Sequence, residues 1–197
     1  MPGSDVETIH AILGGDVERY AELVEKYQGP AIRLACSLVG NYDDAREISQ
    51  EAFVNAYRAL GRFRAAATFS TWFYRIVVNE CKDAYKRRAH QPAAVVRVGT
   101  PGSDEDLPDG LFDVADPGAS PSDQVANHEL SRQLSSSIGA LPMKQRTAFL
   151  LHRVHGLPLD EAAAVMGCRV GTVKAHLFRA THTLRLRLAS WLAKERS

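Results

Sequence analysis

Residues 157–180 constrain the fold of this chain most strongly, because they are typical of two short helices joined by a tight turn at residues 166–168. Pro158 suits the first turn of a helix, where its missing N–H is not needed, and Asp160 and Glu161 favour the positive N-terminal end. Gly167 can adopt the left-handed backbone conformation that ends a helix. The segment therefore predicts a helical hairpin closed at a glycine.

The second helix of this hairpin has an apolar face and a basic face. The apolar residues recur at spacings of three and four or their multiples and should face inward: Val170, Val173, Leu177 and Leu184. The remaining positions place cationic and neighbouring side chains outward or on the flank: Arg169, Thr172, Lys174, His176, Phe178 and Arg179. This is the helix-turn-helix arrangement that enters a DNA major groove. A surface hairpin with a solvated basic face is the alternative. The coincidence of small residues, turn glycine and basic face favours DNA binding.

The general composition is that of a folded chain without a membrane segment. Its 197 residues allow one domain or two small ones, and 45% of them are hydrophobic. No apolar run approaches the roughly 20 residues that cross a bilayer, and residues 1–7 lack the features of a signal peptide. We therefore expect a cytoplasmic protein without membrane insertion.

The cysteine and histidine pattern predicts neither a disulfide nor a metal site. Cys36, Cys81 and Cys168 are far apart and are most simply reduced, buried apolar residues. His152 and His155 lie three residues apart but have no further ligands at suitable spacing. No cofactor is expected.

Charge is distributed in blocks along the chain. Segments 1–60, 61–97, 98–129 and 130–197 carry net charges of −5, +6, −8 and +8, although the whole chain carries only +1. Basic blocks suit phosphate backbones, and the acidic neighbours indicate surfaces for other partners.

The first 60 residues have the period of several helices. Ser4 or Asp5 is expected to cap an opening helix, Asp16 a longer one, and Gly29–Pro30 to interrupt it. Asp43 or Asp44 should begin the next helix, whose buried stripe is Ala45, Ile48, Ala52, Ala56 and Leu60. From composition alone, the polar side of that helix is interpreted as a face exposed to solvent.

Residues 61–68 break the helical pattern and predict a loop, and one helix should follow over 69–88, with Ser70 or Thr71 supplying the cap. Aromatic residues alternate here with cations: Phe69, Trp72, Phe73 and Tyr74 with Arg62, Arg64 and Arg75, followed by Lys82, Lys86, Arg87 and Arg88. Single-stranded nucleic acid is bound in this way, because bases stack on rings while cations hold phosphates. The alternative is that most rings belong to the core, and this is the better reading of Phe73 and Trp72.

The composition changes sharply after residue 91. Proline, glycine and acidic residues without helical period predict a flexible acidic linker over 92–122. Helices are expected over 123–138 and 143–154, before the helix-turn-helix. The predicted fold is all-α, with two small helical domains, residues 1–91 and 123–197, joined by the linker.

Three motifs, in this order, resemble the extracytoplasmic-function (group 4) bacterial RNA polymerase sigma factors. DDAREISQEAFVNAY at 43–57 resembles the core-binding helix of sigma region 2, and TFSTWFYRIVVN at 68–79 resembles the promoter-melting helix of that region. Residues 141–151, 156–163 and 171–180 resemble region 4. The resemblance covers nearly everything except the linker and the chain ends.

The resemblance implies roles that the residues alone left open. The α-helical surface that docks on core RNA polymerase would consist of Asp44, Glu47, Ile48, Gln50, Glu51, Phe53 and Asn55. Melting and holding of the promoter −10 element would fall to Arg62, Arg64, Thr68, Phe69, Ser70, Trp72, Arg75, Asn79, Lys82, Lys86 and Arg87. A flipped base costs a few kcal/mol, which a pocket and stacking must offset.

The same resemblance assigns the −35 element to the helix-turn-helix. Arg169, Lys174 and Arg179 would contact phosphates or guanine edges, with Thr172, His176 and Phe178 beside them. The acidic linker resembles the segment that passes through the RNA exit channel of the polymerase. An anti-sigma factor is an expected partner of this family.

The leading hypothesis is thus an alternative sigma factor that binds core RNA polymerase, recognises promoters and has no catalysis of its own. A two-domain helix-turn-helix transcription regulator with an N-terminal sensor is the alternative, since residues 172–177 also resemble response-regulator proteins. That alternative leaves the region 2 motifs unexplained. An enzyme has little support, because no Gly-rich phosphate loop, Ser/His/Asp set or metal cluster occurs in the sequence.

Overall fold

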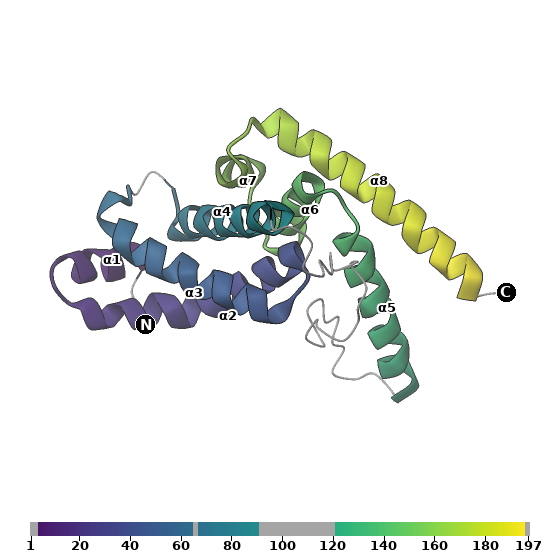
Figure 1. The fold of residues 1–197 in the computed structure, drawn as a ribbon, viewed down its shortest axis with the longest axis horizontal. Helices are drawn as coiled ribbons and strands as arrows, with labels where there is room; N and C mark the ends of the chain where they lie inside the picture. Colours follow the sequence, from purple (N-terminus) through teal and green to yellow (C-terminus); the bar gives the residue numbers. More distant parts are fainter. Residues whose placement is uncertain (1–3, 65–66, 91–120, 196–197) are drawn as a thin grey trace.

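The computed structural model describes residues 4–64, 67–90 and 121–195, and all regular structure within these ranges is helical. The α-helices of this part of the chain are α1 (Asp5–Leu13), α2 (Tyr20–Val39), α3 (Tyr42–Ala59), α4 (Phe69–His90), α5 (Pro121–Gly139), α6 (Met143–Phe149), α7 (Leu159–Met166) and α8 (Val170–Glu195). Helices α1–α4 make the first domain and α5–α8 the second (Figure 1). The prediction of an all-α, two-domain fold is confirmed. The predicted linker lies outside the described residues, except for its last two positions, which begin α5.

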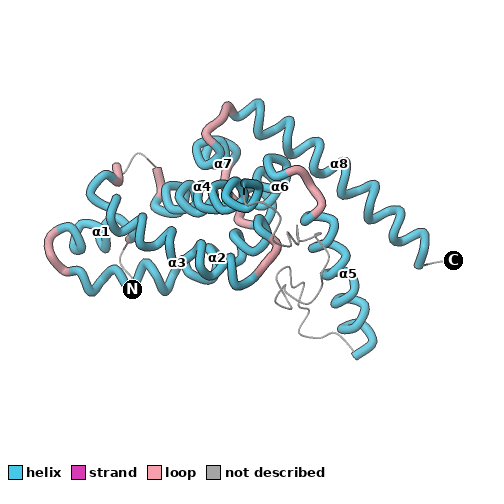
Figure 2. Tube along the Cα trace, in the orientation of Figure 1, coloured by secondary structure: helices cyan, strands magenta, loops and turns pink. Residues whose placement is uncertain are grey.

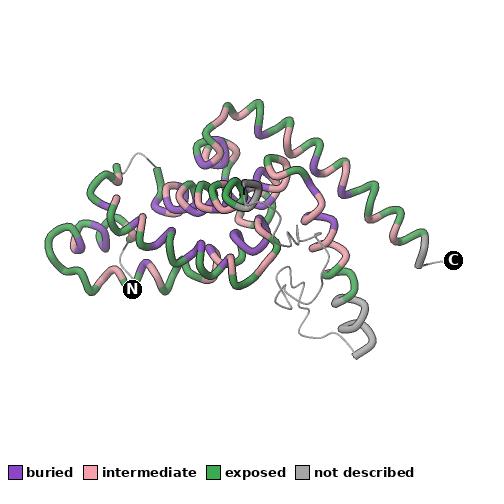
Figure 3. Tube along the Cα trace, in the orientation of Figure 1, coloured by how far each residue is buried: buried purple, intermediate pink, exposed green. Residues whose placement is uncertain are grey.

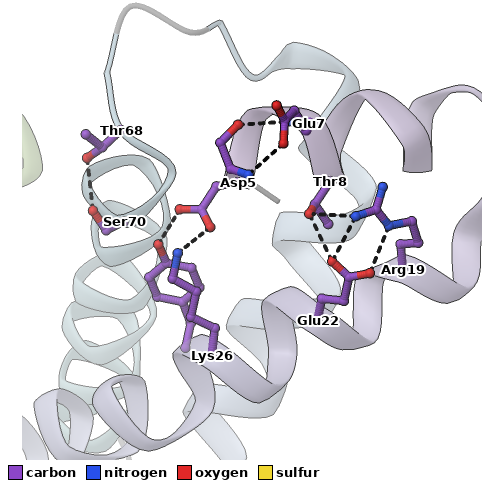
Figure 4. A network of polar contacts seen from close by, with 10 residues as sticks. Asp5, Glu7, Thr8, Arg19, Glu22, Lys26, Thr68 and Ser70 are labelled. Atoms are coloured by element: carbon purple, nitrogen blue, oxygen red, sulfur yellow. Dashed lines mark hydrogen bonds and ion pairs between the residues drawn. The ribbon is translucent and has the colours of Figure 1, made fainter. Parts of the chain in front are cut away.

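Polar contacts fasten α1 to α2. Ser4 caps α1, and its hydroxyl accepts from the Glu7 amide at 3.4 Å while the Glu7 carboxylate accepts from the Ser4 amide at 2.9 Å. One oxygen of Asp5 lies 2.6 Å from Lys26 Nζ, and the other accepts from the Tyr27 hydroxyl at 2.6 Å (Figure 4). The first turn of α1 is thereby held against the middle of α2.

The beginning of α2 differs from the prediction. Asp16 makes no side-chain cap; residues Val17–Arg19 form a 3₁₀ turn, and α2 begins at Tyr20. Asp16 has φ −83° and ψ 70°, which is not the extended conformation that aims a side chain at the free amides of a following helix. Arg19 instead pairs with Glu22 at 2.8 Å, and Glu22 also accepts from the Thr8 hydroxyl (Figure 4).

Helix α2 passes through Pro30 without ending, so the expected interruption at Gly29–Pro30 is wrong. A proline inside a helix costs about 3 kcal/mol, because it removes a hydrogen bond and crowds the preceding turn. Buried residues on both sides of it, Leu23 and Tyr27 before and Ala31 and Leu34 after, anchor the two halves in one core. Tertiary packing therefore overrides the local signal.

The turn into α3 uses Gly40 and Asn41. Gly40 ends α2 at a left-handed φ of 78°, and the Asn41 side-chain oxygen accepts from the Asp44 amide at 2.8 Å. The cap is Asn41, and the predicted start at Asp43 or Asp44 is wrong by one or two residues. Those two carboxylates instead occupy the first turn, where the helix dipole favours negative charge.

The core of the first domain combines small residues with stacked rings. The predicted stripe of α3 is confirmed, since Ala45, Ile48, Ala52, Ala56 and Leu60 are all buried. The alanines let α3 approach α2 and α4 closely. The ring of Phe73 lies 4.5 Å from that of Phe53 and stacks on Phe69 at 5.7 Å between ring centres. Figure 3 shows the buried residues running along the inner sides of α2, α3 and α4.

The second domain contains one irregular turn. The helix predicted over 143–154 is α-helical only to Phe149, and Leu150–Val154 forms a wider π-helical turn. The His155 amide donates to the Leu150 carbonyl, five residues back, at 2.9 Å. The wider turn buries Leu150 and Leu151, which follow each other in the sequence, in the same core.

The predicted helix-turn-helix is confirmed, with two differences: Pro158 precedes the first turn of its helix, and the second helix continues to Glu195. Pro158 takes the N-cap position of α7, one residue before its first turn, and Gly167 ends α7 with φ 65°. Val173 and Leu184 of α8 are buried, whereas Val170 and Leu177 are half-buried against the same core. The long α8 packs on α6, α7 and α5, and its C-terminal end reaches beyond the rest of the second domain (Figures 1 and 2).

Candidate nucleic-acid interface

A polar stripe runs along one side of α4. Arg75, Asn79, Lys82 and Lys86 follow one another at spacings of three and four, so they share one helix face. Arg75, Asn79, Lys86 and Arg87 are exposed, and Lys82 is half-buried. Lys86 pairs with Asp83 at 2.9 Å, and this exposed pair contributes little to stability. The stripe presents donors that could follow a phosphate backbone, with Asn79 at its centre.

The aromatic residues of α4 divide between core and surface. Phe69 is 1% exposed and is enclosed by Tyr27, Phe63 and Phe73, so its predicted contact with an unpaired base is not available in this structure. Phe73 is buried as the alternative reading expected, and Trp72 is half-buried with its ring 5.5 Å from that of Phe63. The Trp72 ring is therefore the better candidate for stacking next to the stripe.

The start of α4 is built from hydroxyl side chains. Thr68 caps the helix, because its Oγ1 accepts from the Thr71 amide at 3.3 Å, and it also lies 2.9 Å from the Ser70 hydroxyl. The predicted caps, Ser70 and Thr71, are therefore replaced by the preceding threonine. Thr71 is buried, and its hydroxyl donates to the carboxylate of Glu161 in α7. The predicted loop begins later than expected, because Leu60–Arg62 forms a 3₁₀ turn; Arg62 in this turn and Arg64 after it are exposed.

The outer face of α3 carries acidic and amide side chains. Glu47, Gln50 and Glu51 are exposed, and Asp44 is half-buried. A groove of about 620 Å³ lies between α2 and α3 and combines polar and apolar walls; its lining includes Tyr20, Val24, Glu47, Gln50, Phe53 and Val54. Among the residues predicted for this surface, Phe53 lines the groove although it is only 8% exposed, and Ile48 belongs to the core. Tyr20, Val24 and Val54 were not singled out by the sequence.

Asn55 faces inward from this surface. Its amide donates to the Glu80 carboxylate of α4 at 2.9 Å, and both side chains are half-buried. Asn55 therefore ties α3 to α4 instead of lying on the outer face with Glu51. Sequence spacing had grouped the two residues because they lie four positions apart on one helix.

The basic face of α8 is largely as predicted. Arg169, Thr172, Lys174 and Arg179 are exposed, and Phe178 has 76% of its surface exposed. His176 is half-buried, and its Nδ1 has no hydrogen-bond partner among the described residues. Burial, with Arg179 and Lys144 nearby, lowers the pKa of His176, so the neutral ring is favoured. Arg185 and Arg187 extend the exposed cationic surface along α8, and the sequence analysis did not single them out.

The cysteines occupy the positions that apolar residues would take. All three are free; Cys36 and Cys81 are buried, and Cys168 is half-buried. Burial raises the pKa of Cys36 to about 11 and that of Cys81 to about 12, which keeps both thiols protonated at neutral pH. Within the described residues no group of three or more His, Cys, Asp or Glu side chains could hold a metal ion. None of the described helices is both long and apolar enough to cross a membrane.

Comparison with known proteins defines the class. Residues 23–91 match Sigma-70 region 2, and residues 131–182 match Sigma-70 region 4. The first match covers most of α2 with α3 and α4, and the second includes α7, the turn and the first half of α8. Two sigma regions thus occur in this chain, region 2 before region 4.

Curated relatives are similar over nearly their whole length. The RNA polymerase sigma-H factor of Pseudomonas aeruginosa is 34% identical over 91% of both chains. The ECF RNA polymerase sigma-E factor of Escherichia coli is 33% identical over 92% of both, and the ECF sigma factor SigW of Bacillus subtilis is 33% identical over 91% of this chain and 94% of its own. The chain belongs to the ECF family of RNA polymerase sigma factors.

Solved structures agree on the fold. CnrH in complex with the cytosolic domain of CnrY matches 95% of this chain with a TM-score of 0.67 and 21% identity. The sigma factor RpoE of Bartonella quintana, in complex with the anti-sigma factor NepR, matches 85% of this chain with a TM-score of 0.60 and 20% identity. The protein is thus an alternative sigma factor, which binds core RNA polymerase and directs it to promoters. The alternative of a sensor-linked transcription regulator has no support from these matches.

Proposed function

We propose that the two domains divide promoter recognition between them. The first domain, residues 1–91, binds core RNA polymerase and opens the −10 element, and the second, residues 123–197, reads the −35 element. The observation that carries this proposal is the separation of two surfaces on the first domain. The acidic and amide face of α3 points away from the core on one helix, while the cationic stripe lies on α4. Opposite charges on separate helices suit two different partners.

The polymerase-binding surface consists of the outer face of α3 and the groove beside it. Glu47, Gln50 and Glu51 supply exposed polar groups, and the groove supplies apolar contact through Val24, Phe53 and Val54. An apolar centre with a polar rim is the usual composition of a specific protein interface. Ile48 supports this surface from beneath, within the core.

The −10 surface consists of the loop before α4 and the α4 stripe. Arg62, Arg64, Arg75, Lys82, Lys86 and Arg87 contribute positive charge for the backbone of an unpaired strand. Asn79 offers both a donor and an acceptor to a base edge, and Trp72 offers a ring. Thr68 and Ser70 contribute hydroxyls at the start of the helix. Phe69 supports this surface from the core, because its buried ring fixes the side of α4 that carries Trp72.

The −35 surface consists of the start of α8. Lys174 and Arg179 contact phosphates or guanine edges, and Arg169 lies before the first turn of the helix. Phe178, which is highly exposed, is placed for apolar contact with a thymine methyl group. The part of the chain between the domains, residues 92–122, connects the domain that carries the −10 surface to the domain that carries the −35 surface.

Further properties follow from family membership. We propose that the protein acts in the cytoplasm, where core polymerase and promoter DNA are found, and that it catalyses no reaction itself. An anti-sigma factor is a partner of this chain by analogy with the sigma factor RpoE of Bartonella quintana, which has a similar fold and was solved in complex with the anti-sigma factor NepR. Such a partner would compete with polymerase for the first domain.

Run-off transcription tests the proposal. Purified protein and core polymerase on a genomic DNA library should yield defined start sites, each preceded by shared −10 and −35 sequences. Glu51→Lys should weaken association with core polymerase in a pull-down without DNA, because it reverses charge at the centre of the α3 face. Asp16→Lys, which makes the same charge change at an exposed position before α2, is the matched control. Unchanged affinity of Glu51→Lys would remove α3 from the interface.

A further inference from the structure

Helix α6 places a cation beside the first half of α8, outside the helix-turn-helix itself. Lys144 is exposed in the first turn of α6, and α6 packs against α8 (Figure 1). Lys144 and Arg179 both lie close enough to His176 of α8 for their charges to act on its ring. These three side chains form one group where α6 meets α8, which we call the junction cluster.

The junction cluster lies along one side of the surface that α8 presents to DNA. The helical period places His176 on the same side of α8 as Thr172 and Arg179, whereas Lys174 and Phe178 lie on the other side. The major groove is about 12 Å wide, and a helix with its side chains has nearly the same diameter. Each side of a helix in the groove therefore meets the backbone of one strand, and the junction cluster borders one of the two.

One ring nitrogen of His176 has no polar partner. Its Nδ1 is closed off from solvent, and none of the described residues offers it a hydrogen bond. A buried N–H without an acceptor would lose its hydrogen bond to water with nothing in exchange, so we assign the ring proton to Nε2. Burial, and then the positive charges of Arg179 and Lys144, lower the pKa of His176, which favours the neutral ring. His176 thus presents a single donor, its Nε2–H.

The junction cluster contains donors but no acceptor for them. Within the part of the chain that the structure describes, Lys144 and Arg179 form no ion pair with an acidic side chain. A neutral His176 adds a donor without a third positive charge, which would repel the other two. Donors from two helices suit an anion with several oxygens, because one such group can accept from both helices at once.

We propose that Lys144 and His176 together bind one phosphate of the promoter backbone beside the −35 element, with Arg179 adding positive charge next to it. Lys144 supplies charge from α6, and His176 Nε2–H supplies a directed hydrogen bond from α8. The inference rests on the proposed function, because that function brings α8 to the −35 duplex. It adds α6 to the DNA-binding surface and makes His176 a residue that positions α8 instead of reading bases.

A phosphate held from two helices fixes how α8 enters the groove. Phosphate contacts set the register and orientation of a protein on the duplex, and two attachment points on different helices restrict rotation more than one does. The ring of His176 is already enclosed on its Nδ1 side, so it loses little freedom when it binds. The base contacts of α8 are thereby aligned by a group outside the helix-turn-helix.

Uncharged phosphate analogues locate the contact. The probe is a promoter duplex from a start site found by run-off transcription, with one backbone phosphate at a time replaced by a methylphosphonate. Its binding to the complex of this protein with core polymerase is followed by fluorescence anisotropy. One position beside the −35 element should weaken binding of the wild type by about ten- to hundredfold, the effect of losing hydrogen bonds to a charged group. The same replacement should have little further effect on the double variant Lys144→Ala, His176→Asn.

Single variants separate the two roles. Lys144→Ala should lower the slope of log affinity against log salt by about 1. Arg132→Ala makes the same charge change at an exposed position of α5 and should leave affinity and slope nearly unchanged. His176→Gln and His176→Asn are a matched pair, because the glutamine amide nitrogen is attached as far along the side chain as Nε2, and the asparagine one only as far as Nδ1. Glutamine should keep most of the affinity, and asparagine should lose about tenfold.

Three results would overturn the inference. The first is a methylphosphonate scan in which every position weakens the wild type and the double variant equally. The second is equal affinity of His176→Gln and His176→Asn, since the donor would then not be Nε2–H. The third is His176→Asn relaxing the preference at one base pair, which would make His176 a reader of bases. Lys144→Ala and its control test the contact even if His176→Asn fails to fold.

Failure of this inference and failure of the proposed function give different results. If run-off transcription yields start sites with a shared −35 sequence while Lys144→Ala and Arg132→Ala bind the promoter equally, only the phosphate contact is wrong. If no shared −35 sequence precedes the start sites, the proposed role of α8 is wrong instead. Every variant should associate with core polymerase as the wild type does, because that association is proposed for the first domain.

Discussion

At the scale of single residues, exposure and hydrogen bonding separate side chains that the sequence treats alike. Glu51 and Asn55 lie one turn apart on α3, yet Glu51 faces solvent and Asn55 bonds to Glu80 at 2.9 Å. Glu51 contributes only when another molecule binds to its exposed side chain. Asn55 contributes mainly to the packing of α3 against α4.

Asn55→Ala should therefore lower stability more than polymerase affinity. It removes one hydrogen bond and leaves the half-buried Glu80 carboxylate without this partner, at a cost of about 1 kcal/mol. Urea unfolding followed by circular dichroism measures the change. Glu51→Ala is the matched control: it should leave the unfolding midpoint unchanged and weaken association with core polymerase. If Asn55→Ala weakens that association with stability intact, Asn55 belongs to the interface after all.

Arg179 of α8 is a residue whose role depends on which DNA group it meets. Arg179→Ala should weaken binding to a −35 duplex while sparing association with core polymerase. A phosphate contact would lower the slope of log affinity against log salt by about 1, whereas a guanine contact would cost about 1–3 kcal/mol at one base pair only. Fluorescence anisotropy across a salt series distinguishes the two. Arg185→Ala, also exposed but six residues further along α8 and away from its first turns, should change affinity less. Equal loss of DNA binding and polymerase binding would refute the division between the two domains.

At the scale of helices, the small residues of α3 decide how closely three helices pack. Ala45, Ala52 and Ala56 are fully buried, and α3 contacts both α2 and α4 along this stripe. Their period of three and four made the stripe predictable, because only one face of a helix at this spacing can turn inward. Packing of this kind leaves no room for larger side chains.

Ala52→Leu should destabilise the first domain by about 1–3 kcal/mol, because the added atoms must displace α2 or α4. Val54→Leu enlarges an exposed residue of the same helix and should change stability by less than about 0.5 kcal/mol. Thermal unfolding of both variants measures the difference. Equal midpoints would show that the space beside Ala52 can expand, which would contradict close packing of the stripe.

Helix interruptions and caps were less predictable than helix faces. Pro30 stays inside α2 because buried residues on both sides hold it, and the π-helical turn at Leu150–Val154 depends on two adjacent leucines sharing one core. Both the continuous helix at Pro30 and the π-helical turn depend on tertiary packing, so local propensity and residue spacing cannot predict them. The Asn41 and Thr68 caps each lie within three residues of the predicted positions, since several neighbouring side chains could have supplied the cap.

At the scale of the whole molecule, the sequence predicted two helical domains but not their contact. Motif order and the acidic block between the domains were enough to separate them, and the basic faces of α4 and α8 followed from helical period. The contact depends on single side chains, such as Arg146 on the Leu38 carbonyl, whose partners lie 108 residues away. No periodic pattern marks such a pair. Phe69, which was predicted as a DNA contact, is buried for a related reason, because a ring beside cations can equally face the core.

His155 lies in this contact and makes it sensitive to pH. Its ring meets Tyr74 edge-on, with 5.2 Å between ring centres, and burial together with the nearby Arg33 lowers its pKa to about 4. Arg33, which is exposed on α2, is the charged group that acts on it, and the buried Tyr74 contacts its ring. The neutral imidazole is therefore the form that this contact between the domains favours.

Stability should fall as the pH drops below about 6.5. Between that value and about 4 the unfolded chain binds a proton at His155 that the folded chain does not bind, so the contribution of His155 to stability is complete above pH 6.5 and lost toward pH 4. The loss can reach roughly 3 kcal/mol, at 1.36 kcal/mol for each pKa unit. Urea unfolding and scattering at pH 7.0 and 4.8 measure it, with His155→Gln as the variant in which this pH dependence should largely disappear. His182→Gln, at an exposed position of α8, should keep the full dependence. A wild type whose compactness and unfolding free energy do not change over this range would show that the His155–Tyr74 contact does not hold the domains together.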